Sequence, residues 1–516
     1  MAARAIVVTV LLASIATRSV PAQQARDTIP VPPAVRAAHL AGTRARTGAP
    51  GSKYWQLWPR YELHAELDPA RATLRGQGTV SFVNTSPTPV TELVLRLDQN
   101  RFRSESGGTP QTRGIAILSL AVNGTAVDLA GPQVSGLHST VARIRLATPL
   151  LPHASLTAAF EWEYEVPKAG AGDALRQGHS DHRTFQMAQW YPRLAMYDDL
   201  AGWDLAPHDG THEFFNPFGS YLVSLRVPPG WLVGATGTLE NPAEVLEARE
   251  RELLRIVALV DTTLAIVPTG AARPRDVGSA AAWRFRADSV NDFAWGTSSD
   301  YGWTVTSRTI ASKRILIHAF ATPARASELT EATRQAGDVI AGLSERIVPY
   351  AWPSHTLVDG PEGAMEYPGL TMSHGTAIPH ELAHQWFPML VGTDETRFDF
   401  LDEGFATLLA GIISGATPGG IGATSATSEP LLHSADLRTP RFVLGYGRGS
   451  RMLLALSKRV GEDRLLNAIK RYAADWRFKH PSPWDFMASM ETSLGEPLDT
   501  FWLDWLFGTK AVGSGR

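Results

Sequence analysis

The chain reads His-Glu-Leu-Ala-His-Gln-Trp-Phe from residue 380 to residue 387. On a helix, His380 and His384 stand four residues apart, so both imidazoles project from one face and can bind the same metal ion. Glu381 follows the first histidine and is within reach of a water molecule at that metal. This spacing of two histidines and a glutamate is typical of a zinc hydrolase centre.

A second stretch, Asp-Glu-Gly-Phe-Ala from residue 402 to residue 406, supplies the ligand that two histidines alone leave missing. Eighteen residues separate His384 from Glu403, which lies in another predicted helix. Catalytic zinc usually has three protein ligands and one open position, and two histidines with one glutamate form such a set. Residues 385–390 contain neither the glycine nor the third histidine of the metzincin motif. The sequence therefore predicts zinc bound by His380, His384 and Glu403.

Length and composition set the class of protein. At 516 residues the chain is too long for one ordinary core, so two domains are expected. A hydrophobic content of 44% and a charged content of 19% are those of a globular protein. A net charge of -3 gives no reason to expect nucleic acid as a partner. The absence of cysteine excludes thiol nucleophiles, thiolate ligands and disulfides, so nitrogen and oxygen atoms must hold any zinc.

The N-terminus has the pattern of a secretory signal. Arg4 precedes an apolar run over residues 5–16, and Val20-Pro21-Ala22 ends in small residues of the kind that a signal peptidase recognises. A membrane anchor is the alternative, but the apolar run is well short of the roughly twenty residues that a spanning helix needs. We therefore expect residues 1–22 to be a cleaved signal peptide. The mature chain should be periplasmic or secreted, without stable membrane insertion.

The periodicity of the remaining chain predicts two domains. Residues 23–52 lack a sustained period and are interpreted as a linker or leader. Alternating apolar residues from Tyr61 to Leu67, followed by further short strands and turn clusters, predict a β domain over residues 53–296. Strands are expected to end near Trp295. Residues 297–516 are predicted to form a mostly helical zinc domain whose helices span residues 329–347, 448–460, 462–474, 483–493 and 498–507.

Three further stretches carry a family resemblance. Gly-Ala-Met-Glu-Tyr over residues 363–367 resembles a Gly-x-Met-Glu-Asn exopeptidase motif, and Gln-Trp-Tyr-Pro-Arg over residues 189–193 resembles a segment of bacterial members. Tyr-Gly-Arg-Gly over residues 446–449 lies where the family has Tyr-x-Lys-Gly. With the metal motif, these stretches make the chain resemble the aminopeptidase N family of zinc metallopeptidases, the gluzincins. The resemblance implies an α+β, multidomain fold, with a saddle-like β domain preceding a thermolysin-like catalytic domain.

The resemblance also implies a role for each matched residue. His380, His384 and Glu403 would bind one Zn²⁺ per chain, and Glu381 would be the general base. Tyr446 would donate its phenolic hydrogen to the oxyanion that develops on the scissile carbonyl.

Substrate recognition is implied by the same comparison. The Glu366 carboxylate would pair with the α-amino group of a peptide, which limits cleavage to the first residue. Its neighbours in the motif would line the same subsite: Gly363, Ala364 and Met365. A second acceptor for the amine is expected from Gln189 or Gln186, and we choose Gln189.

The chain departs from the family pattern at several points. Tyr367 replaces the asparagine of the motif, and Arg448 replaces a lysine with a cation of different donor geometry. His380 comes only fourteen positions after Glu366, so one wall of the cleft should be more open. The large C-terminal helical domain of longer members is also expected to be absent, as in a short bacterial branch. Longer peptides should therefore reach the site.

Three functions are consistent with these motifs. The leading hypothesis is a zinc-dependent aminopeptidase that hydrolyses N-terminal residues from peptides. The second is a gluzincin endopeptidase with the same zinc centre, which would accept peptides with a blocked amine. The third is a catalytically silent peptide-binding or assembly protein. The sequence selects no oligomeric state.

Overall fold

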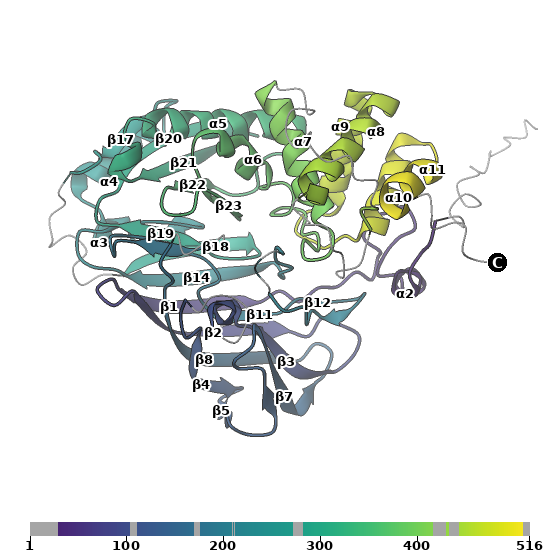
Figure 1. The fold of residues 1–516 in the computed structure, drawn as a ribbon, viewed down its shortest axis with the longest axis horizontal. Coiled ribbons are helices and arrows are strands. Elements are labelled where there is room, and N and C mark those ends of the chain that lie inside the picture. Colours follow the sequence, from purple (N-terminus) through teal and green to yellow (C-terminus); the bar gives the residue numbers. More distant parts are fainter. Residues whose placement is uncertain are drawn as a thin grey trace, which may run out of the picture.

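The computed structural model describes residues 29–103, 111–169, 176–208, 210, 212–271, 282–415, 430–432 and 443–508. The N-terminal part is built mainly of strands, and the C-terminal part is a sheet followed by helices (Figure 1). The predicted signal peptide, residues 1–22, lies outside the described residues. Among the helices in the described ranges, none has the length and apolar character needed to cross a membrane.

An eight-stranded sheet forms the base of the N-terminal part, in the order β16-β18-β14-β1-β2-β8-β4-β5. Every second side chain of β1 is buried, from Tyr61 to Leu67, as the alternation of the sequence predicts. β1 pairs antiparallel with β2 and parallel with β14, so segments far apart in the sequence lie side by side. The strands are β1 (Arg60–Asp68), β2 (Thr73–Val83), β4 (Ala116–Val122), β5 (Thr125–Ala126), β8 (Ser155–Glu165), β14 (Gly219–Arg226), β16 (Thr238–Leu239) and β18 (Trp283–Val290).

Smaller sheets complete the N-terminal part, in the orders β15-β19-β10-β9, β11-β3-β7-β6 and β12-β13. A helix, α4 (Ala248–Val257), interrupts the strands where only strands and turns are expected from the sequence. A capping box between Glu247 and Glu250 begins this helix. The strands are β3 (Val90–Arg96), β6 (Val134–Ser135), β7 (Val141–Leu150), β9 (Gly178–Ser180), β10 (Thr184–Met187), β11 (Arg193–Leu194), β12 (Tyr197–Asp198), β13 (Gly202–Trp203), β15 (Leu232–Ala235) and β19 (Trp295–Ser298).

A six-stranded sheet, in the order β17-β20-β21-β22-β24-β23, precedes the helices of the C-terminal part. The prediction that strands end near Trp295 is therefore wrong. All side chains of β22 and most of those of β20 are buried, including polar ones such as Thr304 and His355, so the polarity of the sequence does not indicate how these strands are buried. The strands are β17 (Leu264–Val267), β20 (Gly302–Ile310), β21 (Lys313–Ala321), β22 (Ser354–Val358), β23 (Ala364–Tyr367) and β24 (Leu370–Ser373).

One helix, α5, lies between β21 and β22 in the chain, and the helices that follow the sheet carry the predicted metal ligands. The expected helix over residues 329–347 is α5, and α6 with α7 form the pair that holds the two ligand motifs. Pro379 is tolerated near the start of α6, where a missing N–H costs little. The elements are α5 (Leu329–Arg346), α6 (Ile378–Ala383), α7 (Glu403–Ser414), η6 (Val443–Gly449), α8 (Ser450–Val460), α9 (Glu462–Asp475), α10 (Pro483–Leu494), α11 (Asp499–Trp502) and η7 (Leu503–Phe507).

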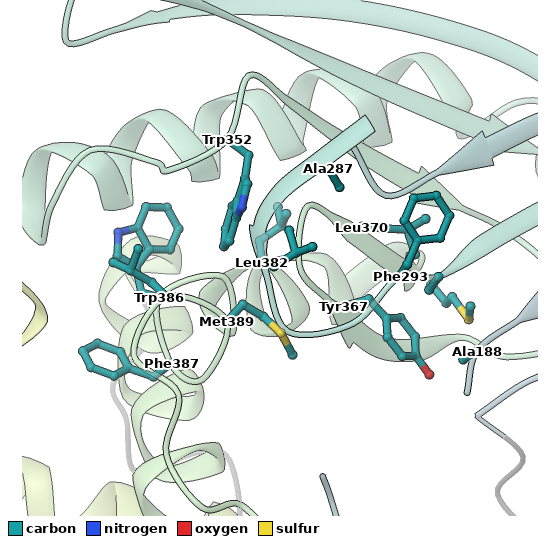
Figure 2. Packing of buried hydrophobic residues seen from close by; sticks show 14 of the residues in the cluster. Ala188, Ala287, Phe293, Trp352, Tyr367, Leu370, Leu382, Trp386, Phe387 and Met389 are labelled. Carbon is teal, nitrogen blue, oxygen red and sulfur yellow. The ribbon is translucent and has the colours of Figure 1, made fainter. Parts of the chain in front are cut away.

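One hydrophobic cluster runs through both parts of the molecule. In Figure 2, Leu382 of α6 lies between Trp352 and Leu370, and Tyr367 and Phe293 belong to the same cluster. Leu382 is fully buried and points away from the histidine face of α6. Because burying a leucine side chain stabilises by about 1.5–3 kcal/mol, this packing fixes the helix that presents the metal motif.

The predicted leader, of which the structure describes residues 29–52, contacts both parts of the chain. Its helix, α2 (Pro33–Ala41), begins with proline at the first position and ends at Gly42 in the left-handed conformation. Beyond it, the Arg44 guanidinium is 2.8 Å from Asp199 of the N-terminal part and forms an ion pair with Asp485 of α10. These three side chains are between 1% and 6% exposed. The leader therefore connects the two parts through a buried cation.

Replacing Arg44 by methionine should destabilise the protein. Methionine fills much of the same space but leaves the carboxylates of Asp199 and Asp485 buried without their cation. Breaking a buried ion pair in this way costs about 3–5 kcal/mol of unfolding free energy. Urea denaturation followed by circular dichroism measures the change, with the exposed Arg46→Met as the matched control. An unchanged denaturation midpoint for Arg44→Met would show that these ion pairs do not stabilise the folded protein.

Candidate active site

The three predicted metal ligands converge. Nε2 of His380 is 3.0 Å from Oε2 of Glu403, Nε2 of His384 is 3.4 Å from the same oxygen, and the two Nε2 atoms are 3.2 Å apart. A tetrahedral zinc ion with ligand distances of about 2.0–2.1 Å places its ligand atoms about 3.3–3.4 Å from one another. The spacing and the nitrogen and oxygen chemistry of the three side chains therefore fit zinc.

Asp402 orients one of these ligands. Its Oδ1 is 2.7 Å from Nδ1 of His384, and both side chains are almost completely buried. Nδ1 of His384 also lies 3.1 Å from the backbone oxygen of Phe387. Two acceptors beside Nδ1 favour the tautomer that carries the hydrogen there, so Nε2 is left to face the metal. Although burial lowers the pKa of His384, the carboxylates of Asp402, Glu366 and Glu403 raise it above its ordinary value. This role of Asp402 is not predicted from the sequence, because an acidic residue just before a helix is also common where it only caps that helix.

Glu381 and Glu366 lie together beside the ligands. A ligand atom from each of these two glutamates and from His384 falls within a 4.8 Å cluster. Burial, and next the negative charge of Glu366, raise the pKa of Glu381 well above its ordinary value. A carboxylate with a raised pKa is a stronger proton acceptor, which is the property that a general base needs.

The exopeptidase-like motif lies on an edge strand. Glu366 is buried in β23, which is the outermost strand of the six-stranded sheet and pairs with β24. Ahead of Glu366, Ala364 is exposed and Gly363 and Met365 are partly exposed. The free edge of a strand can pair with an extended peptide through backbone hydrogen bonds. The arrangement thus places a surface for a peptide backbone next to the buried glutamate.

Tyr446 lies against the metal ligands in η6. Its ring stacks on the imidazole of His380, with ring centroids 5.3 Å apart. Burial, and next the charge of Glu403 and a hydrogen bond to it, raise the pKa of Tyr446 well above its ordinary value. The phenol is therefore protonated at neutral pH and can donate a hydrogen bond. In the same element, the guanidinium of Arg448 lies over the ring of Trp505.

The two candidate glutamines make different contacts. Nε2 of Gln186 donates to the backbone oxygens of Val358 and Glu362, and its Oε1 accepts from the Glu362 N–H at 2.6 Å. Gln186 therefore holds the segment that precedes β23 through three hydrogen bonds to its backbone. Nε2 of Gln189 donates a long hydrogen bond of 3.5 Å to Oδ2 of Asp292. The predicted role of Gln189 in binding an amine stays a prediction.

Three residues near Glu366 were not predicted from the sequence. Carboxylate oxygens of Glu213, Glu366 and Glu395 lie within 4.8 Å of one another. The guanidinium of Arg176 forms an ion pair with Glu213 and has Nη1 3.8 Å from Oε1 of Glu366. These side chains come from segments without a shared motif, so no spacing in the sequence marks them.

Comparisons with known proteins agree with this geometry. No protein-family model matches the chain. Aminopeptidase M1 of Arabidopsis thaliana is 24% identical over 207 residues, which is 32% of this chain and 23% of that protein. Tricorn protease-interacting factor F2 of Thermoplasma volcanium is 25% identical over 207 residues, covering 32% of this chain and 26% of the factor. The match thus spans about a quarter of the length of these curated relatives.

Solved structures match nearly the whole chain. The M1 zinc metallopeptidase from Deinococcus radiodurans has a TM-score of 0.60 at 17% identity, covering 89% of this chain and 96% of that one. The chain has the M1 metallopeptidase fold. A variant of the same bacterial protein bound to a Tyr-Ser-Ala substrate gives a TM-score of 0.62 at 17% identity, with 90% and 97% covered. The predicted α+β class and the resemblance to this family are confirmed.

Proposed function

We propose that this chain is an exported zinc aminopeptidase that removes single residues from the N-terminus of peptides. The observation that carries the proposal is the joint position of Glu366 and Glu381 beside the three predicted metal ligands. Similarity to proteins named as aminopeptidases, and to an M1 fold seen with a tripeptide substrate, supports the same activity. The signal-like pattern of residues 1–22 supports export to the periplasm or the medium.

The residues that would hold zinc are His380, His384 and Glu403, with Asp402 behind His384. When bound, zinc supplies a Lewis acid that polarises a carbonyl and lowers the pKa of water toward about 7. The donor set contains one carboxylate and two neutral imidazoles, so the bound site keeps a positive charge. That charge is the counterpart of the oxyanion that forms during hydrolysis.

The side chains around this set would carry out proton transfer and positioning. Glu381 takes a proton from the attacking water and returns it to the amine that leaves. The Tyr446 hydroxyl donates a hydrogen bond to the oxyanion. The edge of β23 holds the peptide backbone, and Glu366 accepts hydrogen bonds from the substrate α-ammonium. Because Glu366 lies at the end of this strand beside Glu381, the first peptide bond is the one presented for attack.

A comparison of free and blocked peptides tests the proposal. Pairs of peptides that differ only by N-acetylation are incubated with the zinc-loaded protein, and products are followed by mass. We expect stepwise loss of N-terminal residues from free peptides and no cleavage of blocked ones. Glu366→Gln should raise KM for free peptides by about 10- to 100-fold, the effect of losing one charge-assisted contact. Exposed Glu345 of α5 provides the control variant, Glu345→Gln.

Two results would contradict this function. Internal cleavage of acetylated peptides at a comparable rate would identify an endopeptidase with the same zinc centre. Stoichiometric zinc without hydrolysis of any peptide in a broad library would identify a peptide-binding or assembly protein.

A further inference from the structure

A buried arginine lies beside the carboxylate that would bind the substrate amine. Nη2 of Arg176 is paired with Glu213, and Nη1 lies 3.8 Å from Oε1 of Glu366. The side chains of the three residues are 10%, 14% and 5% exposed, respectively. The guanidinium and a substrate α-ammonium are both cations that a carboxylate attracts, so they compete for Glu366. Arginine is a strong competitor because its planar fork can bind one carboxylate through two parallel hydrogen bonds.

The observed distances show which carboxylate holds the arginine. Glu213 is in direct contact with Nη2, whereas Arg176 and Glu366 form a longer ion pair of 3.8 Å without a hydrogen bond. The Arg176 guanidinium carbon also lies 5.4 Å from the centre of the Phe214 ring, which adds a cation–π attraction on the same side. Glu366 therefore keeps acceptor capacity that a bidentate pair with Arg176 would remove.

Glu213 is itself held in place from the C-terminal part. Its backbone oxygen accepts a hydrogen bond of 2.9 Å from Oγ1 of Thr396, the neighbour of Glu395. The backbone oxygen of Arg176 accepts from the Tyr367 hydroxyl at 3.1 Å. Both members of the pair are thus tied to elements that line the site, and their positions relative to β23 are defined.

We propose that Glu213 is a positioning residue that keeps Arg176 away from Glu366, so that Glu366 remains available to the α-ammonium of a peptide. This inference rests on the proposed aminopeptidase function. It assigns to Glu213 an effect that is transmitted through Arg176, and not a direct contact with the substrate. Without the Glu213 charge, the Arg176 guanidinium forms hydrogen bonds with the Glu366 carboxylate. The oxygens of Glu366 are then no longer available to the α-ammonium of a peptide.

A double-mutant cycle tests the inference. KM and kcat for an aminoacyl anilide, and Kd by calorimetry for phenylalaninol, which has an α-ammonium but no scissile bond, are measured for zinc-loaded wild type, Glu213→Gln, Arg176→Gln and the double variant. We expect Glu213→Gln to raise KM and Kd by about 10- to 100-fold, with kcat changed far less. Adding Arg176→Gln should return both constants to within about threefold of the wild-type values, because the competing cation is gone.

A merely structural role for Glu213 predicts a different pattern. The double variant would then be at least as impaired as Glu213→Gln, and this result would overturn the inference, as would wild-type KM in Glu213→Gln. If Glu213→Gln does not fold, Glu213→Asp replaces it and is expected to raise KM to an intermediate extent that Arg176→Gln again reverses. Absence of hydrolysis and of free-amine preference in the wild-type protein contradicts the proposed function itself, which separates the two failures.

Discussion

Replacing Glu381 by glutamine should abolish peptide hydrolysis while zinc remains bound. Glutamine has the shape of glutamate but cannot accept the proton of the attacking water. A positioned general base contributes about 10²–10⁴-fold to a rate, and we expect kcat to fall by an amount near the upper end of this range. The variant retains His380, His384 and Glu403, so its zinc content should equal that of the wild-type protein. Anilide hydrolysis and elemental analysis measure the two quantities.

The environment of Glu381 makes this substitution well suited to the test. Glu381 is 4% exposed, and its carboxylate lies within 4.8 Å of that of Glu366. A glutamine amide at this position can donate a hydrogen bond to the Glu366 carboxylate. Glu345→Gln on the exposed face of α5 controls for the loss of one negative charge. Retention of more than a tenth of the wild-type kcat by Glu381→Gln would mean that another group takes the proton.

The two histidine ligands could be predicted because the geometry of a single helix brings them together. The helix period of α6 and its C-cap brings His380 and His384 to one face, and the fully buried Leu382 fixes the opposite side of the helix in the core. Strand β1 was equally predictable, since its alternation reflects one buried and one exposed face. In both cases the interaction that decides the structure lies within a few residues of sequence.

The remaining features depend on contacts between distant segments. Arg176, Glu213 and Glu395 meet near Glu366 only after the two parts of the chain pack together. The strands β20 and β22 are buried on both faces, and polar side chains such as Thr304 and His355 are buried in them, so polarity in the sequence does not show which residues face the core. α4 is a different case, because its capping box at Glu247 and Glu250 is visible in the sequence, although the surrounding strands led to an expectation of turns.

Replacing Glu403 by alanine should reduce zinc affinity more than any change behind the ligands. Glu403 Oε2 is the atom that lies within 3.4 Å of both imidazole nitrogens, so its removal leaves two ligands where catalytic zinc needs three. Loss of a hydrogen-bond partner behind a ligand costs about 10- to 100-fold in metal affinity. We expect Asp402→Asn to fall in this range and Glu403→Ala to exceed it.

Competition with a chelator of known affinity measures these zinc constants, and circular dichroism verifies that each variant is folded. Glu345→Ala serves as the control for an exposed glutamate. The order of the two effects carries the argument, because a direct ligand contributes a bond to the metal whereas Asp402 acts through His384. If Asp402→Asn lost more affinity than Glu403→Ala, Glu403 would not be a ligand. The cluster around His384 and Asp402 would then have to bind the metal by another set of residues.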